Sequence, residues 1–265
     1  MILSFFAVAV CATAQEEDQW RDRLTQAQRA AGSSQPAEAE QAYMKALHEA
    51  ERFGPEDWRV GTTLQGLGEV YRTEKKLSEA VSTLQRALTV AGKNNDDDTA
   101  EVAGVRYDLG GALLDAGRPA DAVIQARRAL NSYQSVYGGT SAETAGAFCL
   151  LGDSLRLMRN FIDAENPLRR CADIREEKGG IDNLELADAL YSLALACVGE
   201  KKYREAEPRF TMAEKIREKK LGITSPLLAQ TMEDHAALLR VLGRDKEAER
   251  LEKISQAIRH SEKKK

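Results

Sequence analysis

Leu64–Ala87, LQGLGEVYRTEKKLSEAVSTLQRA, is the stretch that decides the fold, because four near-copies of it follow at a fixed interval of 42 residues. Each copy carries an acidic residue followed by alanine. The pairs are Glu79-Ala80, Asp121-Ala122, Asp163-Ala164, Glu205-Ala206 and Glu247-Ala248. Self-similarity at a fixed period is typical of a repeat architecture, in which one small unit of secondary structure is stacked many times.

Two series of small residues keep the same interval. Twelve residues before each alanine stand Gly68, Gly110, Gly152, Ala194 and Ala236. Seven residues after it stand Ala87, Ala129, Cys171, Ala213 and Ser255. Apolar residues between the two series recur at steps of three and four, which is the period of one helix face. Two antiparallel helices approach closely only where neither carries a bulky side chain, so the pattern predicts one helix pair in each unit.

One repeat carries a recognisable signature. Leu67, Gly68 and Tyr71, followed by Ala80 and Ala87, form a pattern that resembles the tetratricopeptide repeat, a helix–turn–helix unit commonly 34 residues long. The longer interval resembles the variant found in kinesin light chains and in many bacterial repeat proteins, where both helices are extended. The resemblance covers nearly the whole chain. It implies an all-α fold, a right-handed α-solenoid of about six antiparallel helix pairs, with a concave face that binds other proteins.

We expect a single solenoid over residues 15–261, followed by a basic tail at 262–265. Its repeats are expected near residues 18–54, 55–97, 98–139, 140–181, 182–223 and 224–261. The first unit is one residue out of register, and the last carries His235 where earlier units have leucine. Terminal repeats that differ from the others are expected, because each has one neighbour rather than two.

The joints between repeats carry helix-start and helix-end signals. Asp98, Thr140 and Asp182 each precede a glutamate by three residues, which predicts capping boxes at three helix starts. Pro226 is expected at the first position of a later helix, where its missing N–H does no harm. The predicted helix ends are marked by Gly92, Gly138-Gly139, Gly179-Gly180 and Gly222.

The N-terminal stretch MILSFFAVAVCATA, residues 1–14, is uncharged and ends in an A-x-A pattern at Ala12-Thr13-Ala14. We therefore predict a bacterial signal peptide and export to the periplasm or the medium. Two alternatives stay open, namely lipidation at Cys11 and a misassigned leader, which would leave the protein cytoplasmic. No transmembrane segment is expected, because a bilayer takes about 20 consecutive apolar residues.

Composition and motifs exclude several function classes. The formal net charge is −4 and no basic stripe is present, so nucleic acid is not an expected partner. The histidines His48, His235 and His260 are scattered, and none has a partner at metal-ligand spacing. Phosphate-binding loops and nucleophile elbows are absent from the sequence. We expect neither a metal, nor a cofactor, nor catalysis.

One of the cysteines keeps an enzymatic function open as a hypothesis. Cys171 and Cys197 stand at repeat positions otherwise filled by alanine or leucine, so we interpret them as small buried hydrophobes. Cys149 maps to the inner face of a first helix, where a thiol could be exposed and reactive. An enzymatic function would rest on that thiol alone.

The resemblance also maps the concave face onto this chain, because first-helix positions line it throughout the family. The mapped residues are, repeat by repeat, Gln65, Glu69 and Arg72; Tyr107, Asp108, Gly111 and Leu114; Cys149, Asp153 and Arg156; Asp188, Tyr191 and Leu195; and Glu233, Asp234 and Arg240. The lysine-and-asparagine clamp with which chaperone-adaptor members hold a terminal carboxylate is absent. An acidic lining with tyrosines instead favours a guest with apolar or basic side chains.

These observations predict a non-enzymatic protein-interaction scaffold that binds a peptide or helix of a partner protein in its groove. Tyr107 and Tyr191 are the expected anchors, since tyrosine supplies rigid contact area. Asp108, Asp153 and Asp188 are expected to select positive charge. The alternative is a structural envelope protein that acts through homo-oligomerisation while its groove stays empty.

Overall fold

The computed structural model describes the backbone of residues 2–33, 35–96 and 98–262, and side chains from Gln15 to Ser261 within those ranges. Met1, the side chains of the predicted signal peptide at residues 1–14 and the tail residues 263–265 lie outside the described residues. The described part is all-α, as predicted, and contains no strand. None of its helices is both long and apolar enough to span a bilayer.

Twelve helices occupy the described part of the chain. They are α1 (Ile2–Gly32), α2 (Pro36–Glu51), α3 (Trp58–Thr73), α4 (Leu77–Asn94), α5 (Ala100–Asp115), α6 (Pro119–Tyr137), α7 (Ala142–Leu157), α8 (Phe161–Gly179), α9 (Leu184–Gly199), α10 (Tyr203–Leu221), α11 (Pro226–Val241) and α12 (Asp245–Glu262). The chain divides into two compact units, an N-terminal unit (Met1–Ser132) and a C-terminal unit (Tyr133–Lys265).

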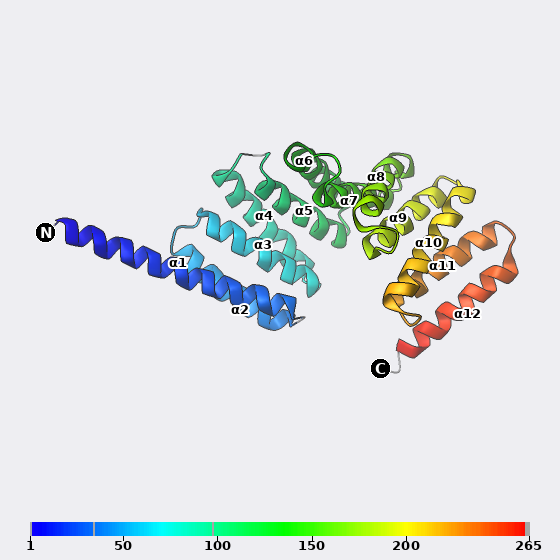
Figure 1. The fold of residues 1–265 in the computed structure, drawn as a ribbon, viewed down its shortest axis with the longest axis horizontal. Coiled ribbons are helices and arrows are strands. Elements are labelled where there is room, and N and C mark those ends of the chain that lie inside the picture. The colour runs from blue at the N-terminus through cyan, green and yellow to red at the C-terminus, as the bar shows by residue number, and fades with distance from the viewer. Residues whose placement is uncertain (1, 34, 97, 263–265) are drawn as a thin grey trace. The chain divides into compact units, whose positions relative to one another are not determined.

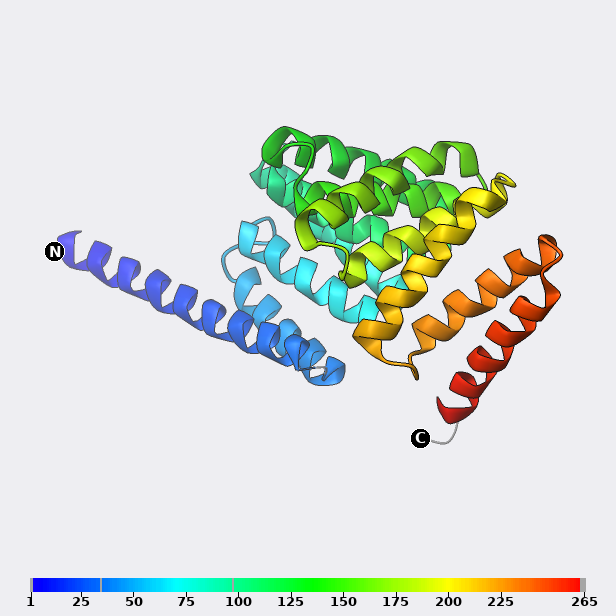
Figure 2. The same cartoon turned by 45° about the vertical axis from the view of Figure 1, so that its right-hand side comes forward.

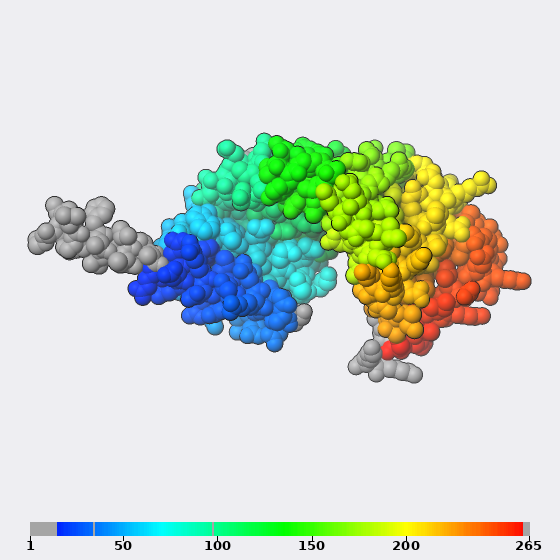
Figure 3. Space-filling view, viewed as in Figure 1, coloured from blue at the N-terminus to red at the C-terminus, as the bar shows by residue number. Residues whose placement is uncertain are grey.

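Within each unit, helices adjacent in the chain pack against one another. In the N-terminal unit α1 packs on α2, α2 on α3, α3 on α4 and α4 on α5 (Figure 1). In the C-terminal unit the same succession runs from α7 to α12, and α11 and α12 lie side by side as an antiparallel pair (Figure 2). The space-filling view shows the helices of the N-terminal unit, coloured blue to green, as one closely packed surface (Figure 3).

Four first helices, α3, α5, α7 and α9, begin at a side-chain cap that recurs every 42 residues. The caps are Asp57, Thr99, Ser141 and Asn183. Each side-chain oxygen accepts a backbone N–H of the first turn; Ser141 Oγ, for example, lies 3.0 Å from the amide nitrogen of Thr144. The predicted caps Asp98, Thr140 and Asp182 are therefore wrong by one residue. Pro226 does take the first position of α11, directly after Ser225.

In the five helix pairs from α3–α4 to α11–α12, the turn inside the pair contains one residue in the left-handed backbone conformation, again every 42 residues. These residues are Lys75, Gly117, Arg159, Lys201 and Gly243, with φ between 61° and 74°. The next residue closes the helix end; Arg118 donates its N–H to the Leu113 carbonyl at 2.8 Å. Glycine holds this conformation without steric cost at only two of the five turns.

The small-residue series mark helix crossings, as the sequence predicts. A Cβ atom added at Gly68 of α3 would lie 2.5 Å from Leu84 Cγ of α4. One added at Gly152 of α7 would lie 2.5 Å from Leu168 Cγ of α8. Glycine thus lets a leucine of the second helix lie directly on the first. Of the predicted helix-end glycines, Gly92 lies inside α4 and does not end it.

Candidate functional site

A cavity of about 580 Å³ opens on the N-terminal unit among α1, α2, α3 and α5. Its apolar wall consists of Leu24, Ala31, Pro36, Ala39, Tyr43 and Val70. Its polar side consists of Gln28, Thr62, Gln65, Glu69, Thr73 and Asp108, and Gly66 completes the lining. The structure therefore brings three of the predicted groove residues, Gln65, Glu69 and Asp108, together at one concave site.

The wall of this cavity is fixed by a close contact between α2 and α3. The ring of Tyr43 lies so near Gly66 that an added Cβ would be 2.4 Å from a ring carbon. Tyr43 is only 6% exposed, and burial raises the pKa of its phenol. A packed, neutral aromatic ring therefore forms part of the apolar wall.

The polar side carries more negative than positive charge. Arg72 donates from Nη1 to Glu69 at 3.1 Å and from Nε to Asp115 at 2.8 Å. Asp108 instead accepts a hydrogen bond from Gln65 Nε2 at 2.6 Å. Burial, followed by repulsion from Glu69, raises the pKa of Asp108 to about 7. In this described cluster two carboxyl groups thus share one guanidinium, and the third, Asp108, is bonded to a neutral amide.

The remaining predicted residues on α3 and α5 support the site from outside the cavity. The Arg72 guanidinium lies over Gly111, where an added Cβ would be 3.1 Å from Nη1. Tyr107 and Leu114 are half-buried and do not line the cavity. The missing side chain of Gly111 thus leaves room for Arg72, which bonds Glu69.

The C-terminal unit uses the equivalent repeat position differently. The hydroxyl of Tyr191 donates to Asp234 Oδ2 at 2.6 Å, and burial followed by this carboxylate raises the pKa of the phenol. The Arg217 guanidinium lies 4.7 Å from the centre of the Tyr191 ring and pairs with Asp188 at 2.7 Å. The structure therefore brings together Asp188, Tyr191 and Asp234, but their polar groups already satisfy one another and Arg217.

Other predicted groove residues of the C-terminal unit form ion pairs within it. The pairs are Asp153 with Arg156 at 2.9 Å, Glu233 with Arg259 at 3.2 Å and Arg240 with Glu252 at 2.7 Å. Leu195 is half-buried. Partly exposed pairs of this kind contribute little to stability, about 0–1 kcal/mol each. They do neutralise charge that a guest would otherwise meet.

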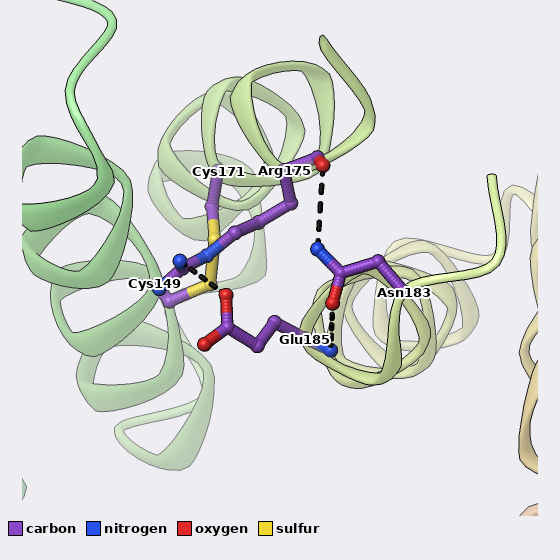
Figure 4. The surroundings of a disulfide bond; sticks show 5 residues. All are labelled: Cys149, Cys171, Arg175, Asn183 and Glu185. Carbon is purple, nitrogen blue, oxygen red and sulfur yellow. Dashed lines mark hydrogen bonds and ion pairs between the residues drawn. A yellow bond between two sulfur atoms is a disulfide. The ribbon is translucent and has the colours of Figure 1, made fainter. Parts of the chain in front are cut away.

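Cys149 is not a free thiol. It forms a disulfide with Cys171 that joins α7 to α8, with the two Cα atoms 5.4 Å apart (Figure 4). The prediction of a reactive thiol at Cys149 is therefore wrong. Cys197 is a buried free cysteine as predicted, whereas Cys171 is buried but is bonded to Cys149 rather than being a simple packing residue. The sequence did contain a signal for the pair, because Cys171 belongs to the small-residue series that marks where the two helices cross.

The disulfide lies beside the joint between α8 and α9. Arg175 of α8 forms an ion pair with Glu185 of α9 (Figure 4). Asn183 donates from Nδ2 to the Arg175 carbonyl at 3.4 Å and accepts the Glu185 N–H at 3.0 Å. The joint is thus tied by side chains as well as by the backbone.

Among the described residues, no three histidine, cysteine or acidic side chains lie close enough together to hold a metal ion.

Models of the tetratricopeptide repeat family match residues 62–94, 101–177 and 150–219. The chain belongs to the tetratricopeptide repeat family. No curated protein matches its sequence. The left-handed turns and the capped first helices described above are therefore features of its individual tetratricopeptide repeats.

Three solved structures illustrate the similarity of this chain to other repeat proteins. BtubC (BKLC) from P. vanneervenii is 21% identical, with a TM-score of 0.70, and the match covers 84% of this chain and 91% of that one. A putative kinesin light chain from Podosopora anserina with nearly identical repeats is 16% identical, with a TM-score of 0.66 and coverage of 80% and 98%. A Rap protein complexed with Competence and Sporulation Factor is 16% identical, with a TM-score of 0.61 and coverage of 91% and 75%.

Proposed function

We propose that this tetratricopeptide repeat protein is a non-enzymatic scaffold that binds an extended segment or helix of a partner protein through its first-helix face. The observation that carries the proposal is the cavity of the N-terminal unit, which has an apolar wall and is lined by residues of the first helices α1, α3 and α5 together with three residues of α2. A few convergent polar groups in an apolar hollow are typical of binding sites. The structurally similar Rap protein, solved as a complex, supports a binding role for the fold.

The size of the cavity suits an anchoring side chain. A volume of about 580 Å³ accommodates one or two large side chains rather than a whole peptide. The rest of the partner segment would then lie along the surface of α3 and α5. Buried anchors of this kind contribute most of the binding energy in protein interfaces.

A blocking variant tests the proposal. Thr73 is exposed at the edge of the cavity, and its hydroxyl donates to the Glu69 carbonyl. Thr89 is exposed on α4, makes the same kind of bond to the Gln85 carbonyl and does not line the cavity. Thr73→Arg should lower affinity for a captured partner at least about tenfold, while Thr89→Arg should leave it unchanged.

The experiment is affinity capture with the full chain as bait, followed by mapping of the captured partner to a binding segment. Equal binding of that segment by both variants would contradict the cavity as the site. Capture of the bait's own copies alone would favour the structural alternative. That alternative is supported by the exposed Ile181 and Ile223, which stand at the same position in successive repeats and are 57% and 67% exposed.

We also propose that the protein is exported. The A-x-A pattern at Ala12-Thr13-Ala14 supports a cleaved signal peptide, and the disulfide between Cys149 and Cys171 supports an oxidising compartment. Mass spectrometry of the protein recovered from fractionated bacteria tests this. A mature chain that begins at Gln15 in the periplasm or medium is expected, and an uncleaved chain confined to the cytosol would contradict export.

A further inference from the structure

The cavity of the N-terminal unit has an apolar wall that leads to an acidic side. Leu24, Tyr43 and Val70 are among its apolar lining residues, and Glu69 and Asp108 supply its carboxyl groups. None of the described residues that line the cavity is basic. A guest that fits this arrangement needs an aliphatic stem and a positive tip, which is how a lysine side chain is built.

The acidic side lacks its full complement of positive charge. The guanidinium of Arg72 is already shared between Glu69 and Asp115. Asp108 has the neutral amide of Gln65 as its partner. A cation that entered the cavity would therefore meet carboxyl groups that retain acceptor capacity, since each carboxylate offers about four lone pairs.

From this charge complementarity we infer that the cavity takes a lysine side chain of the partner segment, with its methylenes on the apolar wall and its ammonium between Glu69 and Asp108. The inference rests on the proposed function and adds the chemistry of the anchor. Lysine fits better than arginine because one Asp108 oxygen is held by Gln65 and both Glu69 oxygens are held by Arg72. A planar guanidinium needs a paired carboxylate edge, whereas an ammonium donates in any direction.

The residues equivalent to Gln65 and Asp108 in the C-terminal unit are already bonded to other side chains. Asp234 accepts hydrogen bonds from both Tyr191 and Gln230, and Asp188 is paired with Arg217. The acidic residues on that face have internal partners in the described structure. Lysine recognition is thus assigned to the cavity of the N-terminal unit rather than to the first-helix face around Tyr191.

Three immobilised libraries of random nonapeptides test the inference. Their central residue is fixed as lysine, norleucine or arginine, and the labelled full-chain protein is the probe. Norleucine keeps the aliphatic stem and lacks the ammonium. For peptides selected from the lysine library, replacement of lysine by norleucine should weaken binding about tenfold at pH 8, and replacement by arginine should weaken it several-fold. Fluorescence anisotropy gives the dissociation constants.

Protein variants locate the effect. The double variant Glu69→Gln with Asp108→Asn should lose the preference for lysine over norleucine, and Glu69→Gln alone serves if the double variant melts early. Asp115→Asn is the matched control, because Asp115 contacts Arg72 without lining the cavity, and it should keep the preference.

The preference for lysine should also increase between pH 6 and pH 8 as Asp108 ionises. The groups that face Asp108 from α3 are Glu69, Arg72 and the neutral Gln65, and Tyr43 of α2 lines the same cavity and stays neutral over this range. A preference that does not change over this range would argue against contact between the ammonium and Asp108.

The outcomes separate the inference from the proposed function. Equal binding of lysine and norleucine peptides, or stronger binding of arginine peptides, would overturn the lysine assignment and leave the scaffold proposal standing. A lysine preference that survives in the double variant would place the ammonium elsewhere. No peptide binding, or binding that Thr73→Arg does not reduce, would overturn both.

Discussion

The two units build the same capped helix pairs but leave their first-helix faces in different states. In the N-terminal unit, Gln65 donates to Asp108 at the edge of an open cavity. In the C-terminal unit, Tyr191 makes the corresponding bond to Asp234, and Arg217 covers its ring. One repeat pattern therefore supports either an open face or one filled by its own side chains. The residues that do not follow the repeat pattern decide whether the face is open or filled.

The largest effect is expected from breaking the covalent tie of the C-terminal unit. Cys149→Ser with Cys171→Ser should lower its free energy of unfolding by about 3 kcal/mol, because the bond closes a loop with a sequence separation of 22. Urea unfolding of oxidised wild type and variant measures the difference. A reducing agent should destabilise the wild type equally and leave the variant unchanged, and equal midpoints under oxidising conditions would contradict a stabilising bond.

Helix crossings allow the two units to be compared at the same repeat position. Gly68→Ala and Gly152→Ala should each cost roughly 1–3 kcal/mol, because the added methyl overlaps a leucine of the second helix. Gly152→Ala should cost more, since the backbone nitrogen of Leu168 also lies 3.1 Å from the added atom.

Thermal or urea unfolding compares these variants with a glycine that has no such contact. Gly92→Ala, with no neighbour within 4 Å of the added Cβ, should instead stabilise α4 by roughly 0.5–1 kcal/mol. If all three variants behaved alike, close approach at the crossings would not explain the small-residue series.

Asp108 gives the open face a pH dependence. Its pKa of about 7 in the folded protein exceeds the ordinary value of 3.8, so the folded state holds the proton more tightly. The associated stability is complete below about pH 4 and is lost as pH rises through 7. Between pH 5 and pH 8 the wild type should lose roughly 1–3 kcal/mol more than Asp108→Asn. Parallel stability profiles for the two proteins would show that Asp108 titrates normally.

The smallest effect concerns the closed face. Tyr191→Phe removes the hydroxyl that bonds Asp234 and should cost roughly 0.5–1.5 kcal/mol in urea unfolding. The loss is modest because Asp234 keeps its bond from Gln230 at 3.0 Å and the ring still packs. A gain in stability would show that the hydroxyl is not needed to hold this face together.

The residues that repeat every 42 positions predicted the helix pairs and their crossings. The exact cap residues and the disulfide partner were missed because they depend on contacts that the repeat spacing alone does not show. Gly68 and Gly152 indicate helix crossings because the same steric demand recurs in each repeat. The predicted cap Thr140 is wrong by one residue because adjacent Ser141 can make the same bond and the spacing alone does not distinguish them. The partner of Cys149 depends on which residue lies opposite across the crossing, which becomes clear only when two helices are placed together.

The candidate site was predictable in outline. The family resemblance selected Gln65, Glu69 and Asp108, and the structure brings all three to one cavity. The family resemblance did not show that Tyr191 and Asp234 bond each other, because that contact joins residues 43 positions apart in two different repeats. Whether a groove residue is available to a guest depends on such contacts between repeats.

The central claim is that the open face of the N-terminal unit receives the partner, and chemical-shift mapping tests it most directly. The isotopically labelled full chain is titrated with the tightest peptide from the lysine library. Shifts at the Gln65 side-chain amide and at the backbone amides of Glu69 and Asp108 are expected, with Tyr191 and Asp234 unmoved. Shifts at Tyr191 and Asp234 with none at Gln65 would contradict the account.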